Sequence, residues 1–366
     1  MICNFYMKTF KAKIEIVSLF SGCGGGDLGL LGGFDFLGRN YGRLDFKIIW
    51  ANDIDSYAVR TYRRNIGSHI VEEDITKIRS SEIPDHDLLV GGFPCQTFSV
   101  VGQRKGFGDS RGLLYREMVR ILKAKKPAAF IAENVKGLVS VDKGRVYEKI
   151  LSDFEDAGYR VFPKVLNASQ FGVPQKRERL FMVGVRSGVK NGFEFPVPKE
   201  EIVSLAAVAE NNEDVDPRYY FSNRAVEGLK KANKAFNKGR AQDMSQPCNT
   251  ISTHLAKVSL NGTDPVILVR KDTYRRLTPK EAARIQSFPD TFEFEGTDAK
   301  RYIQIGNAIP PALMWHVARA VQDQIFYDRR LHQEKEERDN VAHSFEEYRN
   351  REVGILKVAR QESLFS

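Results

Sequence analysis

Short apolar runs alternate with amphipathic stretches along the first third of the chain. Apolar runs typical of buried strands cover residues 14–20, 46–50, 87–90 and 128–132, and a further one covers 180–185. Between them, residues 56–65 and 113–123 have the apolar spacing of helices, with Leu114, Met118, Ile121 and Leu122 on one side of the second. This alternation predicts an α/β fold in which helices connect the strands of a parallel sheet.

The pattern changes at about Ser187, where glycine and proline become frequent and no regular alternation of strand and helix follows until about residue 273. We interpret this stretch as a separate, irregular module. Order returns at 277–287, where Thr278 can cap a helix and Pro279 suits its first turn. An apolar helix is expected from Pro310, and the tail from Leu331 is charge-rich, which is typical of a solvated helix or a partly disordered segment.

Composition narrows the class of protein. The chain has 366 residues, 42% of them hydrophobic, and 56 Lys and Arg against 47 Asp and Glu, a net charge of +9. No apolar run is long enough to span a bilayer, and the N-terminus lacks the layout of a signal peptide. The four cysteines and six histidines form no metal-binding pattern. We therefore expect a cytoplasmic protein without a structural metal, and the charge favours acidic partners such as nucleic acid without establishing one.

A glycine-rich turn joins the first expected strand to a helix. Gly24, Gly26 and Gly29 satisfy the dinucleotide pattern G-x-G-x-x-G, and Asp53 lies where a ribose-binding carboxylate would end the second strand. Asp74 is a second carboxylate near a strand end, and two such groups suit an adenosine moiety. The pattern alone leaves nicotinamide, flavin and S-adenosylmethionine sites open.

A candidate nucleophile follows the third strand. Cys95 lies between Pro94 and Gln96 at the carboxyl end of a parallel strand, where open α/β sheets place their sites. Glu133 follows the neighbouring strand, and Arg177 and Arg179 are expected to project to the same side of an extended segment. A thiol, a carboxyl group and a guanidinium together suit attack on an electron-poor ring, and this set has no use in hydride transfer.

The chain resembles the DNA (cytosine-5)-methyltransferases of the bacterial modification type over nearly its whole length. Six motifs carry the resemblance and occur in the family's order: Phe20-Ser21-Gly22-Cys23-Gly24-Gly25, Gly92-Phe93-Pro94-Cys95-Gln96, Glu133-Asn134-Val135, Gln175 to Arg179, Arg276 to Pro289, and Gln304 to Ala308. The irregular stretch falls where the family has its variable target-recognition region, and Thr250-Ile251 is similar to the family's Thr-aliphatic dipeptide.

The resemblance implies a Rossmann-like methyltransferase domain with a smaller, irregular target-recognition domain, and S-adenosylmethionine as the methyl donor, released as S-adenosylhomocysteine. It implies division into a main catalytic part (1–186), a target-recognition domain (187–272), a hinge with the penultimate motif (273–303), a return to the catalytic domain (304–330) and a tail (331–366). Residues expected to bind the cofactor are Phe20, Ser21, Gly22, Cys23, Gly24, Gly25, Asp53, Ile54, Asp74, Ile75, Pro94 and Asn307. Ile54 stands where many family members have an aromatic residue, so stacking on that face of the adenine is expected to be weaker.

The resemblance also implies that Cys95 attacks carbon 6 of a flipped cytosine, that Glu133 holds ring nitrogen 3, and that Arg179 binds the ring carbonyl with Arg177 positioning the site. The glycine-rich loop 99–112 is similar to the loop that closes over the flipped base. Residues expected to contact the DNA are Phe93, Gln96, Ser99, Gln103, Arg104, Arg111, Gln175 and Thr250.

Several alternatives remain open at the level of sequence. A tRNA cytosine methyltransferase of the same fold shares the Pro-Cys-Gln and Glu-Asn-Val elements, but it usually has proline where this chain has Thr97. An idle DNA-binding protein or a nicotinamide enzyme is a rival of another class. The basic residues Lys230, Lys231, Lys234, Lys238 and Arg240 form either a solvated face or a DNA contact. We expect a monomer that acts on double-stranded DNA, with a restriction endonuclease as a possible genetic partner.

Overall fold

A computed structural model of the chain describes residues 13–94, 114–188, 192–198, 202–231, 241–256 and 264–327. At its centre is one seven-stranded sheet with the strand order β5-β4-β1-β6-β7-β10-β8. Strand β10 runs antiparallel to both of its neighbours, and the other strands are parallel. The strands are β1 (Ile14–Leu19), β4 (Phe46–Asp53), β5 (Ile70–Glu72), β6 (Leu88–Gly91), β7 (Ala129–Val135), β8 (Tyr159–Asn167) and β10 (Glu178–Arg186).

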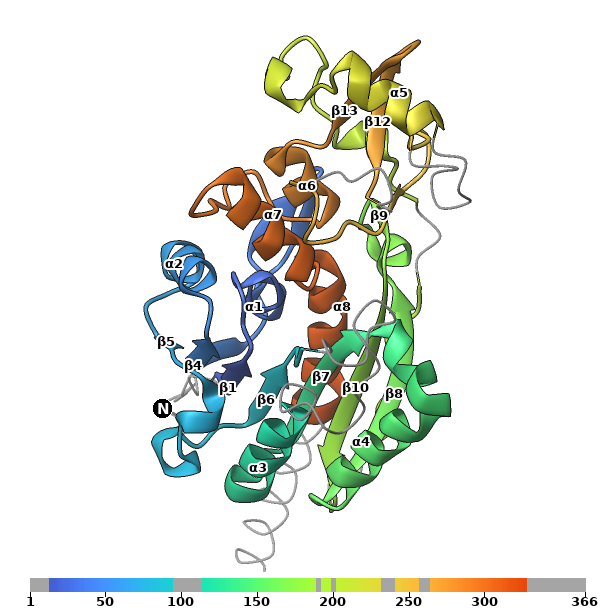
Figure 1. The fold of residues 1–366 in the computed structure, drawn as a ribbon. Coiled ribbons are helices and arrows are strands. Elements are labelled where there is room, and N and C mark those ends of the chain that lie inside the picture. Colours follow the sequence, from blue (N-terminus) through green and yellow to red (C-terminus); the bar gives the residue numbers. More distant parts are fainter. Residues whose placement is uncertain are drawn as a thin grey trace, which may run out of the picture.

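Helices cover both faces of this sheet (Figure 1). They are α1 (Gly25–Leu31), α2 (Ser56–Asn65), α3 (Tyr115–Lys125), α4 (Arg145–Glu155) and α8 (Pro311–Val321). Strand β1 explains why two layers are needed, since its side chains alternate between two hydrophobic clusters. Ile14 and Ile16 pack with α1, α2 and α8 on one face, and Val17 and Leu19 pack with α3 and α4 on the other. The α/β fold expected from the alternating pattern is confirmed.

Most of the strands and helices predicted from the sequence are present. Helix α2 has the predicted bounds, α3 begins at Tyr115, and Thr278 caps α6 (Pro279–Ile285) through a capping box with Glu281. The sequence pattern did not predict α4 or β8. Strand β8 lies at the edge of the sheet and contains the exposed residues Arg160 and Lys164, so its apolar periodicity is weak.

Most of the chain between residue 202 and α6 lies beyond the carboxyl ends of the parallel strands, at the top of Figure 1, whereas residues 192–198 pack beside β8 and η9. Its elements are short. It contains η6 (Leu205–Ala207), η7 (Pro217–Tyr219), α5 (Asn223–Lys231), β11 (Cys248–Asn249), β12 (Val266–Arg270) and β13 (Thr273–Arg276). Strands β12 and β13 form an antiparallel hairpin that turns at Asp272, so this hairpin spans the predicted domain boundary between 272 and 273.

Smaller elements complete the described chain. Strand β11 pairs with β9 and thereby joins the upper part to the region of the central sheet. The remaining elements are β2 (Phe34–Phe36), β3 (Arg39–Tyr41), η1 (Ile75–Lys77), η2 (Ser80–Glu82), η4 (Lys136–Gly144), η5 (Ala168–Phe171), β9 (Gln175–Lys176), α7 (Asp298–Asn307) and the π-helical turn η9 (Gln322–Tyr327).

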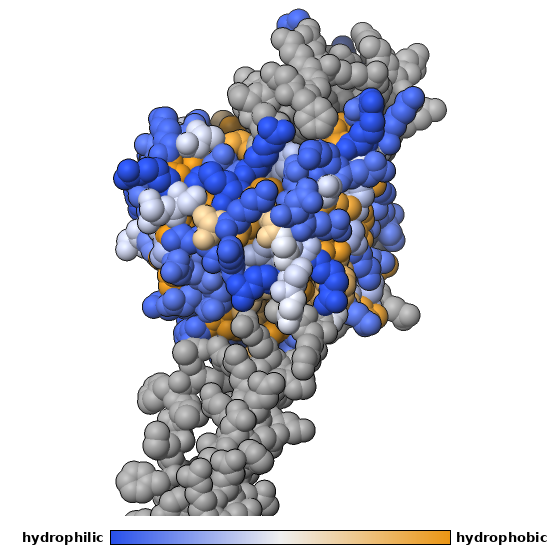
Figure 2. All heavy atoms as spheres, turned by 90° about the horizontal axis from the view of Figure 1, so that it is seen from below, coloured by the Kyte–Doolittle hydropathy of each residue, from blue (hydrophilic) through white to orange (hydrophobic). Residues whose placement is uncertain are grey.

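The molecular surface is mainly hydrophilic at the end of the molecule opposite to α5, as Figure 2 shows for the described residues. None of the helices in the described ranges is long and apolar enough to cross a membrane. Within the same ranges, no group of His, Cys, Asp and Glu side chains is arranged to hold a metal ion.

Candidate active site

The glycine loop after β1 turns sharply and leaves one side open. Phe20, Gly22 and Gly24 all have positive φ angles, of 54°, 57° and 94°. The amide of Gly24 donates to the carbonyl of Ser21 at 3.0 Å, which closes the turn before α1 begins. A Cβ atom built on Gly22 would meet no atom within 4 Å, so open space adjoins the loop there. A left-handed conformation at Phe20, which costs a non-glycine residue about 1–2 kcal/mol, is typical of binding sites.

Asp53, the last residue of β4, lies against this loop. Its Oδ2 accepts from the amide of Gly22 at 2.8 Å and its Oδ1 from the amide of Asp55 at 2.9 Å. Burial raises the pKa of the carboxyl group, and the two backbone donors oppose that shift. Each carboxylate oxygen can accept further bonds, so Asp53 can also receive ligand hydroxyl groups. The neighbouring Ile54 is 69% exposed beside it.

The other side of the loop is closed by the C-terminal part of the chain. Cys23 is buried among Phe288, Phe292 and Ala308, and burial raises the pKa of its thiol to about 12. A Cβ atom on Gly25 would lie 2.8 Å from the carbonyl oxygen of Ile309, so only glycine fits. Cys23 is therefore a protonated residue of the hydrophobic core. The exposed Asn307, at the end of α7, directly precedes Ala308 in the sequence.

Asp74 and Ile75 follow β5, the edge strand that pairs with β4. Asp74 caps η1 and accepts from the amide and the hydroxyl of Thr76 at 3.0 and 2.8 Å. These bonds lower the pKa of its carboxyl group. Both bonds are made by Oδ1, and among the described residues no hydrogen bond reaches Oδ2. Ile75 is only 3% exposed and packs into the core below.

An acid and an arginine face each other at the ends of β7 and β10. Glu133 Oε1 lies 3.1 Å from Arg179 Nε, and both side chains are 12% exposed. Burial raises the pKa of Glu133, and the two guanidinium groups of Arg179 and Arg177 oppose this. Burial likewise lowers the pKa of Arg179, against the attraction of Glu133. A carboxyl group with a raised pKa keeps its proton at higher pH than an ordinary glutamate does.

The same pair adjoins the segment that leads to Cys95. A Cβ atom on Gly92 would lie 3.2 Å from Glu133 Oε2, so the carboxylate rests against this segment. Asn134 holds the segment from the same strand, because its Nδ2 donates to the carbonyl of Phe93 at 3.0 Å. Phe93 itself is buried next to Tyr115, and Pro94 is half-buried.

Arg177 binds backbone oxygens and joins three distant parts of the chain. Its guanidinium donates to the carbonyls of Ile251, Gly306 and Ala308 at 3.2, 2.8 and 3.3 Å. The side chain is 2% exposed, and this burial lowers the pKa of the guanidinium. A Cβ atom on Gly306 would come within 2.6 Å of the backbone of Ser252, so α7 and the segment around Ser252 touch directly.

Gln175 and Thr250 belong to the same junction. Gln175 is fully buried; its Nε2 donates to Gln286 Oε1 at 2.6 Å and its Oε1 accepts from the amide of Ile251 at 2.9 Å. Gln286 in turn donates to the carbonyls of Ile305 and Ala308. The exposed Thr250 donates to the carbonyl of Lys176 at 2.7 Å. The structure thus brings Gln175, Arg177 and Thr250 together where the segment around Ile251 meets β9 and the end of α7.

Several predicted residues lie outside the described ranges. They are Cys95, Gln96, Thr97, Ser99, Gln103, Arg104 and Arg111 of the nucleophile region, the basic residues Lys234, Lys238 and Arg240, and the tail from Leu331.

Sequence patterns missed several side chains that shape this region. Asn134 belongs to the motif Glu133-Asn134-Val135, and its side-chain amide next to Glu133 could have indicated a role in the site. Asp27 stands in the glycine loop as an unexplained acid. No local signal identifies Gln286, or the buried ion pair in which Arg275 Nη2 lies 2.7 Å from Glu281 Oε1.

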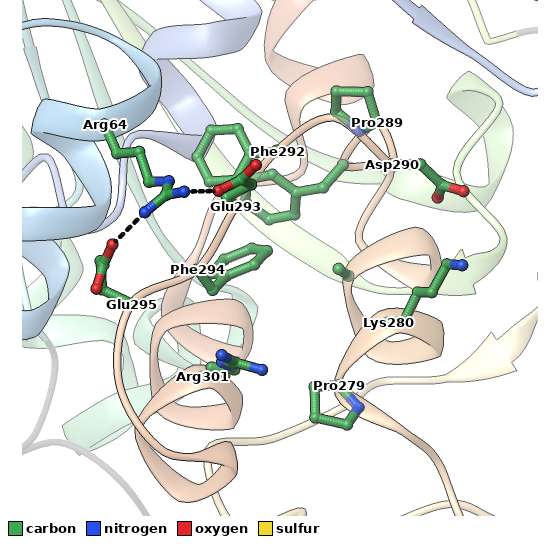
Figure 3. A pocket seen from close by; sticks show the side chains of 12 residues that line it. Arg64, Pro279, Lys280, Pro289, Asp290, Phe292, Glu293, Phe294, Glu295 and Arg301 are labelled. Carbon is green, nitrogen blue, oxygen red and sulfur yellow. Dashed lines mark hydrogen bonds and ion pairs between the residues drawn. The ribbon is translucent and has the colours of Figure 1, made fainter. Parts of the chain in front are cut away.

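A cavity of about 400 Å³ lies behind the glycine loop and is drawn in Figure 3. Phe288 and Phe292 line it and also pack in the cluster around Cys23, so these rings separate the cavity from the loop. Arg64 forms ion pairs with Glu293 and Glu295 at one side, Lys280 lies at the other, and Arg301 lies below Phe294 in this view. None of the residues predicted to form the site is among the described residues that line this cavity.

Comparison with known proteins identifies relatives of the whole fold. The profile of the C-5 cytosine-specific DNA methylase family matches residues 14–323. The Type II methyltransferase M.NlaX of Neisseria lactamica is 40% identical over 302 residues, 81% of this chain and 92% of that protein. The Type II methyltransferase M1.ScrFI of Lactococcus lactis subsp. cremoris is 37% identical over 308 residues, 81% of this chain and 75% of that protein. The solved structure of the methyltransferase EhMeth of Entamoeba histolytica has the same fold, with a TM-score of 0.66 at 19% identity over 85% of this chain and 98% of that one.

Proposed function

The chain belongs to the family of C-5 cytosine-specific DNA methylases and is a DNA (cytosine-5)-methyltransferase, and we propose that it methylates a flipped cytosine through a covalent bond to Cys95, with S-adenosylmethionine as methyl donor. The observation that carries this route is the pair of Glu133 and Arg179, which lies against the segment leading to Cys95. A carboxyl group with a raised pKa and a fixed cation are what a cytosine ring needs on its nitrogen 3 and its carbonyl oxygen.

The open side of the glycine loop fits S-adenosylmethionine. The loop consists of Ser21, Gly22, Cys23, Gly24 and Gly25, and the open space beside Gly22 gives a ligand access to its backbone. Asp53 can accept from ribose hydroxyls, and Asp74 has an oxygen available for the adenine amine. Phe20 and Ile54 supply apolar surface for the adenine ring, and we expect Asn307 to contact the methionine end. When bound, this cofactor supplies an electrophilic methyl group on a sulfonium centre.

The residues of this chain carry out the remaining chemistry. The Cys95 thiolate forms a bond to carbon 6, and the displaced electron pair makes carbon 5 nucleophilic. Glu133 gives its proton to nitrogen 3, which prevents negative charge from building on the ring. Arg179 binds the carbonyl oxygen at the same time. After methylation, water takes the carbon 5 proton, the electron pair returns to expel the thiolate, and nitrogen 3 gives its proton back to Glu133.

Arg177 and Gln175 have a supporting part in this proposal. They hold the segment around Ile251 and Thr250 against α7, so that the region from 187 to 272 can read a specific sequence. Loop 99–112, with Ser99, Gln103, Arg104 and Arg111, closes over the flipped nucleotide.

The named relatives are Type II methyltransferases, which supports a role as the modification half of a restriction-modification system. We infer a cytoplasmic monomer acting on chromosomal DNA, with a cognate endonuclease as its genetic partner.

A transfer assay with two substrates tests the proposal. The full chain is incubated with methyl-labelled S-adenosylmethionine and either mixed-sequence duplex DNA or a tRNA transcript, and the nucleosides are then separated. We expect label in 5-methylcytosine from the DNA alone, and none with Cys95→Ala. Label in the tRNA only would assign the chain to RNA, and label with Cys95→Ala would remove the proposed nucleophile.

A further inference from the structure

A carboxylate that the proposed mechanism does not use lies behind the glycine loop. Asp27, in the first turn of α1, is 2% exposed. Its Oδ1 accepts from the Ser18 hydroxyl and its Oδ2 from the Tyr62 hydroxyl, both at 2.7 Å. Across the described ranges, no lysine, arginine or histidine forms an ion pair with it. Burying a carboxylate that only two neutral hydroxyl groups stabilise costs free energy, so we expect Asp27 to have a role beyond packing.

Both donors to Asp27 also hold the cofactor loop. The Ser21 hydroxyl bonds to the carbonyl and the hydroxyl of Ser18, both at 3.0 Å. Because Ser18 donates its one proton to Asp27, its hydroxyl oxygen must accept from Ser21. The Tyr62 ring lies beneath Gly24, where a Cβ atom would come within 3.1 Å of it. Asp27 thereby holds Ser18 in contact with Ser21 at one end of the turn and Tyr62 in contact with Gly24 at the other.

A third group extends this arrangement towards solvent. The Tyr62 hydroxyl lies 3.0 Å from His69 Nε2, and the two rings meet edge to face with centroids 5.6 Å apart. Tyr62 donates its proton to Asp27, so Nε2 of the imidazole is the donor in the bond to Tyr62. His69 is half-buried, and this burial lowers the pKa of its ring. A continuous hydrogen-bonded chain therefore runs from the surface to the base of the loop.

We propose that Asp27 is a positioning residue for the cofactor loop, and that taking up a proton at Asp27 loosens this loop and weakens cofactor binding. This inference rests on the proposed binding of S-adenosylmethionine at the loop. An ionised Asp27 accepts a hydrogen bond from both Ser18 and Tyr62. A protonated Asp27 has an O–H group, which must donate a hydrogen bond to one of these two hydroxyl oxygens. Either Ser18 or Tyr62 then has to turn its hydroxyl proton elsewhere, and the contacts to Ser21 or Gly24 change with it.

The charge state of Asp27 changes in an accessible pH range. Burial raises the pKa of its carboxyl group to about 6, and the bonds from Tyr62 and Ser18 oppose that shift. Near pH 7.5 the group is ionised, and near pH 5.5 most of it is protonated. The titratable groups around it are Cys23 and Asp53 on the loop side, with Tyr62 and His69 on the side of α2. Cys23 and Tyr62 stay protonated throughout this range, because burial raises the pKa of both.

Binding of S-adenosylhomocysteine to the full chain, measured by calorimetry at both pH values, tests the proposal. We expect the wild type to bind about tenfold more weakly near pH 5.5, because the bonds to a charged acceptor are lost. Asp27→Asn is expected to bind about tenfold more weakly already near pH 7.5, with little further change at the lower pH. Its KM for the cofactor rises accordingly, while kcat at saturating cofactor changes by less than about threefold. His69→Gln should keep the pH dependence of the wild type.

Two further variants separate positioning from general loss of stability. Tyr62→Phe removes only the hydroxyl and should weaken binding in the same direction as Asp27→Asn. Ile150→Val, on the buried side of α4, lowers stability without touching the loop and should bind normally. If Asp27→Asn does not fold, Tyr62→Phe and Ser18→Ala carry the test.

Three results would overturn the inference. They are normal binding by Asp27→Asn, normal binding by both hydroxyl variants, and a pH dependence that survives in Asp27→Asn, which would assign it to Asp53. If the wild type bound no cofactor at either pH, the proposed function would fail instead.

Discussion

The two ends of the candidate site are built in different ways. At β1 and β4, a tight turn and the carboxylate at the end of the neighbouring strand make the geometry, with the Gly24 amide on Ser21 and the Gly22 amide on Asp53. At β7 and β10, side chains bring together distant segments, and Arg177 alone binds carbonyls 74 and 129 residues away. The first end is set by the turn after β1 and its contact with the end of β4, whereas at the second end Arg177 holds the segment around Ile251 against the end of α7. Substitutions at the two ends should therefore have separable effects.

The largest expected effect is on the chemical step at the second end. Glu133→Gln keeps the shape of the side chain but cannot give a proton to the ring, so kcat should fall about 10²- to 10⁴-fold. Affinity for S-adenosylhomocysteine, set at the other end, should stay unchanged. Single-turnover kinetics and calorimetry measure the two quantities separately.

The pH profile sharpens this prediction. Burial raises the pKa of Glu133, so the wild type keeps the proton at higher pH than an ordinary glutamate, and kcat should fall as pH rises through that raised pKa. Glu133→Gln should lack this fall. Glu178→Gln, on the exposed side of the same β10 segment, is the matched control and should retain both kcat and the profile. An equal loss of cofactor affinity in Glu133→Gln would contradict the separation.

The next effect concerns the junction that Arg177 forms with Ile251, Gly306 and Ala308. Arg177→Met removes the donors to three buried carbonyls, which should lower the free energy of unfolding by about 3 kcal/mol and weaken DNA binding. Urea denaturation and DNA titration provide the measurements. Arg79→Met, an exposed arginine paired only with Glu82 among the described residues, should leave stability as it is. Unchanged stability in Arg177→Met would mean that the junction does not depend on this side chain.

A smaller effect is expected at the first end. Asp53→Asn keeps an acceptor for the Gly22 amide but loses the charge, so the affinity for S-adenosylhomocysteine should fall about tenfold. At saturating cofactor kcat should remain within about threefold of the wild type. Calorimetry and steady-state kinetics together would detect the opposite outcome, a loss of kcat with normal affinity.

The smallest effect concerns the thiol in the glycine loop. Burial raises the pKa of Cys23 to about 12, so at about pH 8 only about 10⁻⁴ of it is thiolate. Mass spectrometry after brief treatment with iodoacetamide should find Cys23 unmodified in the folded protein, along with Cys248, which is similarly buried. Rapid labelling of Cys23 would show that the loop is not packed against Phe288 as described.

The same contrast explains how far the sequence could be interpreted. The glycine spacing predicts the turn at Gly22 and Gly24, and the apolar run before Asp53 predicts its place at a strand end, because both depend on neighbouring residues. Gln286 and the Arg275–Glu281 pair have no such local signal, since their partners come from segments that meet only in the folded protein. Arg177 and Arg179 share a motif, yet one binds backbone carbonyls and the other faces Glu133, and only tertiary packing separates them.

Trapping on 5-fluorocytosine tests the central claim most directly. Fluorine at carbon 5 cannot leave as a proton does, so a duplex containing the target with this base should hold the enzyme in a covalent complex once the methyl group has been transferred. The wild type should give a complex that survives denaturation and requires S-adenosylmethionine, and peptide mapping should place the DNA on Cys95. A stable complex formed by Cys95→Ala, or attachment to another residue, would contradict the account.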